Sequence, residues 1–73
     1  MTIDKLIDLR EELILRGVKG QQVETCIETF LQSLDEYKSK YGSAKHLVGD
    51  AYYKAMSDRN EFAYQQAIKI LEG

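Results

Sequence analysis

The stretch QQVETCIETFLQSLDEYKSKY, Gln21–Tyr41, carries the clearest helical pattern in the chain. At about 100° per residue its apolar side chains share one stripe, while polar side chains such as Gln32 and Ser39 lie opposite. The stripe consists of Val23, Cys26, Ile27, Phe30, Leu31, Leu34, Tyr37 and Tyr41. An amphipathic helix of this length buries its stripe against other helices. Gly42 follows the last apolar residue and predicts the end of the helix at 41.

A shorter helix is predicted upstream, over about 3–16. Thr2 is a good N-cap for it, and its apolar side chains fall on one broad face. Gly17 is expected to end this helix, which leaves GVKG as a tight turn into the helix over 21–41. A turn this short favours antiparallel or steeply crossed neighbours.

Downstream of Gly42 the pattern predicts two more helices, over about 44–56 and 59–71. The apolar stripe of the second is rotated from that of the first by more than about 100°, and one straight helix cannot aim both at a single core. Asp58 with Glu61 also resembles a capping box. We therefore expect a break near 57–58, and the alternative is one long, bent helix over 44–71.

Composition is consistent with a small globular domain. The chain has 73 residues, of which 44% are hydrophobic and 30% charged, and it contains no proline. No β-hairpin signal competes with the helical pattern. The predicted fold class is therefore all-α, a small bundle of three to four short helices in a single domain, 1–73. The single Cys26 fits a reducing compartment, and no apolar run is long enough to span a bilayer, so a cytoplasmic protein without membrane contact is expected.

The segment VGDAYYKAMSDRNEFAYQQAIKIL, 48–71, resembles the helix–turn–helix unit of tetratricopeptide repeats. Gly49, Ala51, Tyr52, Tyr53 and Lys54 are similar to the end of that family's first helix, and Tyr64, Ala67 and Ile68 to its second. Asn60 departs from the family pattern, which has a small alanine there, and no 34-residue period repeats upstream. The resemblance implies a helical hairpin over 44–71 and binding to peptides or proteins.

Basic and aromatic residues gather only in YKSKYGSAKH, 37–46. One interpretation is structural, because Lys38 and Lys40 complement the dipole at the end of a helix. The alternative is a nucleic-acid surface formed by Lys38, Lys40, Lys45 and Lys54, most plausible in a dimer. Nucleic acid is the less favoured partner because the sequence pI is about 5.3.

Catalytic and metal chemistry have little support in the sequence. Cys26 lies within an apolar stripe beside Glu24 and Glu28, which would raise its pKa, so a nucleophilic pair with His46 is not expected. His46 and Asp50 have i,i+4 spacing on the expected helix, but two ligands do not complete a metal site. We therefore expect no enzymatic activity, no cofactor and no metal.

Three features remain for binding. Glu24, Glu28 and Asp35 form an acidic row on one flank of the helix over 21–41, which would suit a basic partner. Leu15 and Tyr53 each point about 160° away from the apolar face of their own helix. Arg10 falls inside the apolar arc of the first helix, either with its stem packed and its charge in water or paired with a carboxylate of the next helix.

The sequence thus predicts a small, non-enzymatic protein-binding module such as a regulator, inhibitor or adaptor. Its contact residues would be Tyr53 and Leu15, or the acidic row Glu24, Glu28 and Asp35. Its partner would be another protein. A homodimer that uses Leu15 and Tyr53 to complete its core is a further possibility.

Overall fold

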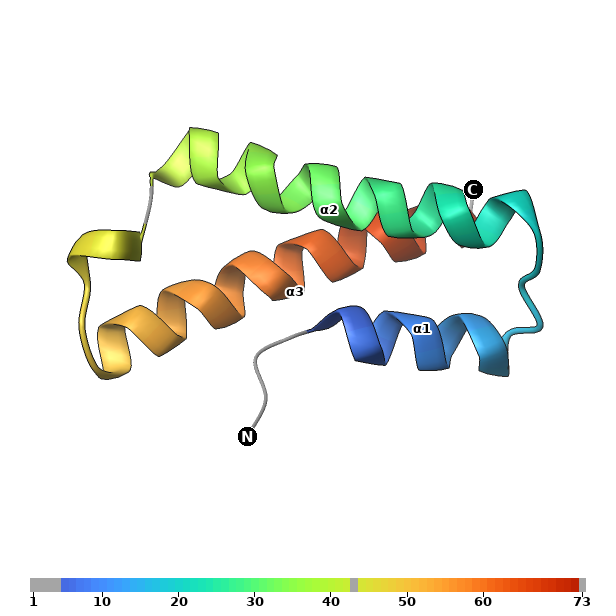
Figure 1. The fold of residues 1–73 in the computed structure, drawn as a ribbon, viewed down its shortest axis with the longest axis horizontal. Helices are drawn as coiled ribbons and strands as arrows, with labels where there is room; N and C mark the ends of the chain where they lie inside the picture. Colours follow the sequence, from blue (N-terminus) through green and yellow to red (C-terminus); the bar gives the residue numbers. More distant parts are fainter. Residues whose placement is uncertain (1–4, 43, 73) are drawn as a thin grey trace.

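The computed structural model describes residues 5–42 and 44–72, and these residues are almost entirely helical. The elements in chain order are α1 (Lys5–Leu15), α2 (Gln21–Tyr41), the 3₁₀ turn η1 (Ala44–His46) and α3 (Asp50–Glu72). Figure 1 shows α2 running antiparallel to α1, and α3 running back along α2 in the direction of α1. The predicted small all-α bundle is confirmed, with three α-helices over the described residues.

The hydrophobic core lies where all three helices meet. Leu9 and Leu13 of α1 and Cys26 and Phe30 of α2 are buried against α3. The contribution of α3 is Ala63, Ala67 and Ile68. The two alanines have small side chains, which lets the backbone of α3 approach its neighbours closely. Phe30 is the largest of the fully buried side chains, so the core depends on it most.

The end of α1 is set by Gly17. This residue has φ 73°, a conformation that glycine adopts without the strain other residues meet. Its amide donates to the carbonyl of Ile14 at 3.0 Å, and the Val18 amide donates to that of Leu13 at 2.9 Å. These bonds satisfy carbonyls that the helix end leaves free, so the predicted role of Gly17 is confirmed. The bounds of α2 also match the prediction, whereas Thr2, the expected N-cap of α1, lies outside the described residues.

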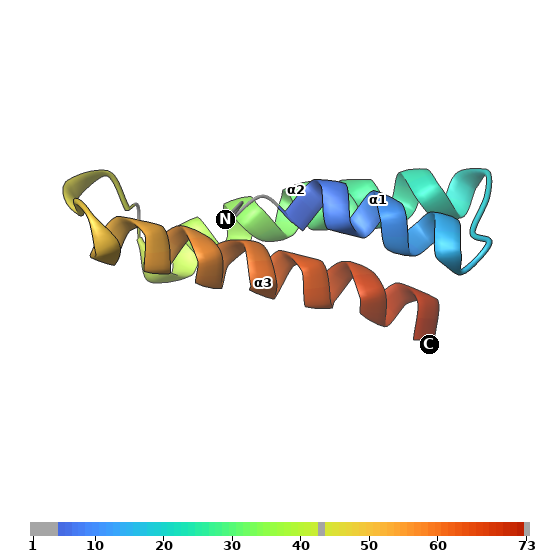
Figure 2. The same ribbon diagram turned by 90° about the horizontal axis from the view of Figure 1, so that it is seen from below.

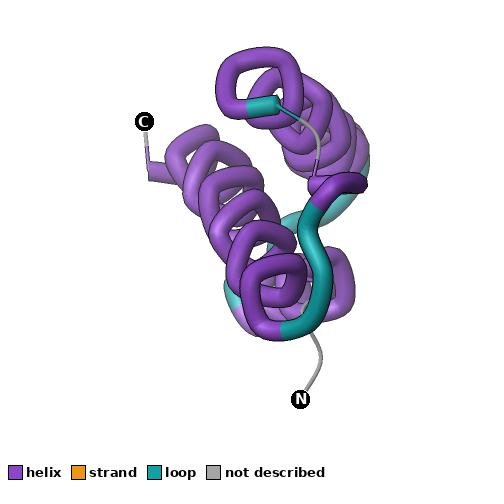
Figure 3. Tube along the Cα trace, turned by 90° about the vertical axis from the view of Figure 1, so that its left-hand side faces the viewer, coloured by secondary structure: helices purple, strands orange, loops and turns teal. Residues whose placement is uncertain are grey.

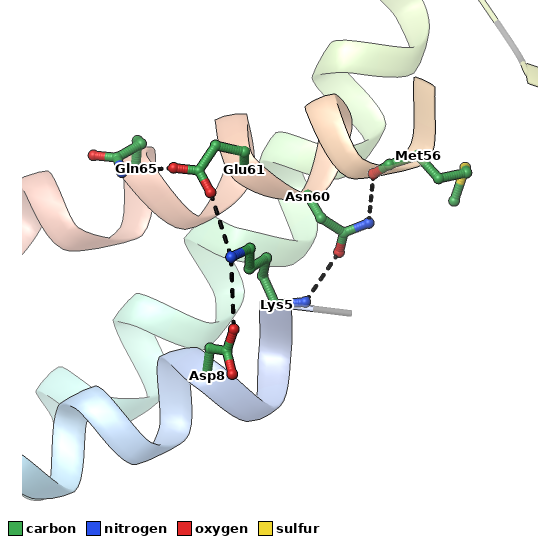
Figure 4. Close-up of polar contacts among 6 residues, drawn as sticks. All are labelled: Lys5, Asp8, Met56, Asn60, Glu61 and Gln65. Carbon is green, nitrogen blue, oxygen red and sulfur yellow. Dashed lines mark hydrogen bonds and ion pairs between the residues drawn. The ribbon is translucent and has the colours of Figure 1, made fainter. Parts of the chain in front are cut away.

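A network of hydrogen bonds and ion pairs around Lys5 and Asn60 joins the start of α1 to the middle of α3 (Figure 4). The Asn60 amide nitrogen donates to the Met56 carbonyl at 2.9 Å, and its side-chain oxygen accepts from the Lys5 backbone amide at 3.4 Å. The Lys5 ammonium lies 3.6 Å from both Asp8 and Glu61. Asn60 is buried, and both ends of its side chain are bonded. It therefore sets the position of α1 along α3 rather than leaving a gap in the core.

The predicted break near 57–58 is wrong, because α3 continues without interruption through Ser57 and Asp58. The two rotated stripes are real, but they face different neighbours. Ala55 and Met56 face the C-terminal part of α2, while Ala67 and Ile68 join the core with α1. The alternative of one continuous helix is therefore correct from Asp50 onward, and that helix serves both stripes because the molecule has different packing at its two ends.

The predicted helix over 44–56 is also wrong in its first part. Only Ala44–His46 form a 3₁₀ turn, and α3 begins at Asp50 after Gly49, which has φ 61°. The helical hairpin implied by the resemblance to tetratricopeptide repeats is not formed, since a single helix occupies Asp50–Glu72.

The molecule has two unlike ends, because α1 is only half as long as the other helices. Figures 1 and 2 show α1 lying beside the first half of α2 and the second half of α3. We call this part the three-helix end. At the two-helix end, the last turns of α2 meet only the first turns of α3, and η1 connects them (Figure 3). The resulting shape is elongated, 39 × 25 × 16 Å.

Candidate functional site

The most distinctive surface of the three-helix end is an apolar groove between α1 and α2, beside the turn that joins them. It encloses about 370 Å³ and is lined by Arg10, Leu13, Ile14, Val18, Val23 and Ile27. On the helical wheel Ile7 falls beside Ile14, two turns earlier in α1, and Leu31 falls beside Ile27, one turn later in α2, so both extend this apolar surface. Ile7, Ile14 and Leu31 are all exposed, Ile14 to 77%. We call this surface, from Val18 at the turn to Leu31, the hairpin face.

The hairpin face exists because the apolar side chains of α1 and α2 extend further around each helix than the part that is buried in the core. On α1, Leu9 and Leu13 point into the core, and Ile7 and Ile14 lie about 120° around the helix from them. On α2, Cys26 and Phe30 are buried, and Ile27 and Leu31 lie on the flank. α3 covers one side of the hairpin only, so the other side has no helix on it among the described residues.

The acidic row borders this apolar surface. Glu24, Glu28 and Asp35 are all exposed, and on the helical wheel they follow directly after Ile27 and Leu31. The order around α2 is therefore the buried stripe, an apolar flank with Ile27 half-buried and Leu31 exposed, and the acidic row. The sequence predicted the acidic row, but it assigned Ile27 and Leu31 to the buried stripe.

Arg10 is the one cation that lines the groove. It is exposed, and no ion pair to a carboxylate of α2 is formed within the described part of the chain. This agrees with the interpretation in which the stem packs on apolar neighbours and the guanidinium reaches water. The acidic row contributes three negative charges and Arg10 contributes one positive charge. The hairpin face and the acidic row together therefore have two net negative charges.

Leu15 and Tyr53 do not form one surface. Leu15 is 82% exposed at the last residue of α1, and Tyr53 is 60% exposed in the first turn of α3. These positions lie at opposite ends of the molecule. The Tyr53 ring makes an edge contact with Tyr52, with centroids 5.7 Å apart. Leu15 and Tyr53 therefore belong to separate surfaces, and exposed apolar side chains of this kind are common on proteins.

The two-helix end contains a second groove, of about 430 Å³, between α2, η1 and α3. We call it the joint groove. Its cationic lining is Lys38, Lys45 and Arg59, with His46 beside them, and its aromatic lining is Tyr37, Tyr41 and Tyr52. The remaining lining residues are Gly42, Leu47, Ala55, Met56 and Asp58. Of the four lysines predicted as a nucleic-acid surface, Lys38 and Lys45 line the joint groove; Lys40 and Lys54 do not.

The residue pairs that the sequence analysis weighed for catalysis and for metal binding, and did not favour, do not take the required arrangement among the described residues. Cys26 is fully buried, and burial raises the pKa of its thiol, which disfavours the reactive thiolate. About 20 Å of helix separates Cys26 from the end of α2, and His46 lies beyond that end. His46 and Asp50 are not on one helix, since His46 belongs to η1 and Asp50 begins α3. Residues 5–42 and 44–72 contain no group of three or more His, Cys, Asp or Glu arranged for a metal ion.

Comparison with other proteins gives no further guidance. No protein-family model matches the chain, and neither the curated proteins nor the solved structures contain a significant match. Over the described ranges, no helix combines the length and the apolar character needed to cross a membrane. The functional proposal therefore depends on the two surfaces themselves.

Proposed function

We propose that the protein is a non-enzymatic binding module that captures an amphipathic, basic helix of a partner protein on the hairpin face. One observation carries the proposal: an exposed apolar groove between α1 and α2 lies beside the acidic row Glu24, Glu28 and Asp35. Helix-in-groove recognition needs an apolar channel for one face of the ligand helix. Charges along the edge of the channel then select the partner and its orientation.

The size of the hairpin face suits such a ligand. α1 has 11 residues and so is about 16 Å long, which three turns of a partner helix would match. Ile14 and Ile27 would contact the apolar face of the ligand, and basic side chains would reach the acidic row. Arg10, within the groove, would favour a ligand with one acidic residue at the facing position.

A second copy of this chain is a less suitable occupant. Two hairpin faces brought together would place two acidic rows near one interface, and like charges there oppose association. A basic partner removes this repulsion. The charge of the hairpin face thus favours a different protein over self-association.

The proposal is testable with model peptides of about 14 residues, four helical turns, that place Leu on one face and Lys on the other. A matched peptide with Glu in place of Lys keeps the apolar pattern and reverses the charge. We expect fluorescence anisotropy to show binding of the Leu–Lys peptide at least about tenfold tighter than that of the Leu–Glu peptide at low salt. Equal affinities for the two peptides would overturn the proposal.

Neighbouring residues provide matched control variants. Ile14→Lys places a charge in the groove and should weaken Leu–Lys peptide binding about tenfold or more, the effect expected at a buried contact. Leu15→Lys adds the same charge at the next residue, outside the groove. It should therefore change the affinity for the Leu–Lys peptide by less than about twofold. Glu28→Lys, compared with Glu36→Lys, tests the acidic row in the same way.

Self-association is measured on the same samples. Sedimentation without peptide should show a monomer. A dimer that Ile14→Lys abolishes and Leu15→Lys preserves would assign the hairpin face to a second copy of the chain and contradict the proposal.

A further inference from the structure

The joint groove forms because α2 and α3 diverge where α1 does not reach. Figure 3 looks along the molecule from this end and shows the connection through η1 crossing from α2 to α3. The groove volume of about 430 Å³ falls within the usual range for small-molecule sites. Its apolar lining includes Met56 and Ala55.

The charge of the groove is opposite to that of the chain. Lys38, Lys45 and Arg59 line it together with a single carboxylate, Asp58, which leaves two net positive charges without counting His46. The whole chain has a net charge of −2. A local positive field on an acidic protein attracts anions to this one place.

The aromatic side chains add a second kind of contact. Tyr37 and Tyr41 have ring centroids 4.5 Å apart, and Tyr37 also contacts Phe62 at 5.4 Å, so this pair is held in place. Tyr41 nevertheless remains 63% exposed, and Tyr52 on α3 is also exposed. Exposed tyrosine rings beside cations are suited to stacking against a planar ring whose substituent is anionic.

Arg59 is positioned by the fold. Its Nε donates to the Leu34 carbonyl at 3.1 Å, and one terminal nitrogen lies 4.0 Å from the Met56 sulfur. The bond to α2 holds the guanidinium at the lining of the groove instead of letting it extend into water. A held cation loses less conformational entropy when it binds an anion than a free surface lysine does.

We propose that the joint groove binds a nucleotide unit, with its base stacked against Tyr41 and Tyr52 and its phosphate near Lys38 and Arg59. Two sources share this chemistry: a free nucleotide and an unpaired nucleotide within a single strand. The site is separate from the hairpin face and does not depend on the function proposed for it. Of the four lysines that the sequence suggested for nucleic acid, only Lys38 and Lys45 line the joint groove.

The test is an amide chemical-shift titration of the full chain with adenosine 5′-monophosphate. We expect shifts confined to the residues of the joint groove. Adenosine, which lacks the phosphate, and inorganic phosphate, which lacks the ring, should each bind at least about tenfold more weakly. Binding of phosphate as tight as that of the nucleotide, or shifts located elsewhere, would overturn the proposal.

Two pairs of variants test the residues. Lys38→Glu and Tyr41→Ser alter the groove and should each weaken nucleotide binding about tenfold. Lys54→Glu outside the groove, and Leu15→Ser at an exposed side chain of the three-helix end, make comparable changes and should have less than about a twofold effect. Far-ultraviolet circular dichroism checks folding; should a groove variant unfold, competition by added salt on the unaltered chain tests the role of the cations instead.

The two sources are separated with a single-stranded oligonucleotide of about six adenosines. Affinity more than about tenfold above that of the mononucleotide supports a strand, and equal affinity supports a free nucleotide. A peptide of alternating Glu and Tyr is the counter-probe. Binding of this peptide in the joint groove without binding of the nucleotide would assign the groove to an acidic protein segment and overturn the proposal.

Discussion

The two ends of the molecule use the same pair of helices differently. At the three-helix end, α1 joins α2 and α3, and Leu9, Cys26 and Phe30 are removed from water. At the two-helix end, aromatic side chains such as Tyr41 and Tyr52 line an open groove. The comparison shows that the short length of α1 decides where the chain is stabilised and where it has surface available for a ligand.

The three-helix end is therefore expected to supply most of the free energy of folding. A chain of 73 residues buries a limited share of its surface and has little stability to lose. The side chains of the two-helix end contribute less because water reaches them. This difference is open to direct test by substitutions matched between the two ends.

The largest effect is expected from Phe30→Ala. Truncating this fully buried ring should lower the free energy of unfolding by about 3–5 kcal/mol, through lost transfer energy and the cavity left behind. Tyr41→Ala, a matched aromatic truncation at the two-helix end, should cost less than about 1 kcal/mol because the ring is exposed. Urea denaturation followed by circular dichroism measures both. Equal costs would show that the two ends are equally packed.

The next largest loss of stability is expected at Asn60, whose hydrogen bonds join α1 to α3. Asn60→Ala removes the acceptor for the Lys5 amide and the side-chain donor to the Met56 carbonyl, and should cost about 1–3 kcal/mol because two hydrogen bonds and the packing of a buried side chain are lost. Hydrogen exchange should accelerate most in α1. Uniform acceleration over α1, α2 and the rest of the chain would mean that Asn60 supports the whole fold and not the position of α1.

A smaller effect follows from the buried thiol. Burial raises the pKa of Cys26 above its ordinary value of 9.0, so the folded state keeps the proton to higher pH than the unfolded state does. The corresponding stability is full below pH 9 and is lost as pH rises toward the folded pKa, with a slope of at most about 1.4 kcal/mol per pH unit. Cys26→Ala should flatten this slope just above pH 9, below the ordinary pKa of 10.0 from which Tyr64, whose pKa is also raised by burial, adds a slope of its own. Identical slopes would contradict the burial of the thiol.

Local signals predicted the parts of the fold that depend on few neighbours. Gln21–Tyr41 matched its predicted bounds because a single stripe and Gly42 define it, and Gly42 has φ 88° with its amide bonded to the Lys38 carbonyl at 2.8 Å. Gly17 likewise ended α1 where expected. Each of these features is specified within a few residues of the chain.

The missed features depend on which helices meet. The break at 57–58 was inferred on the assumption that every stripe faces one core, whereas α3 faces different neighbours along its length. The hairpin face was missed for a related reason. Ile14 and Leu31 have the pattern of buried residues, and only the arrangement of α3 on the opposite side of α1 and α2 leaves them exposed.

The measurement that tests the central proposal most directly is amide chemical-shift mapping with the Leu–Lys peptide, because it reports both ends at once. We expect shifts along the hairpin face, at residues such as Ile14, Val23 and Ile27, and unchanged signals at Tyr41 and Tyr52. Shifts concentrated at the joint groove, or no shifts at peptide concentrations up to about 1 mM, would contradict the assignment of the hairpin face as the protein-binding surface.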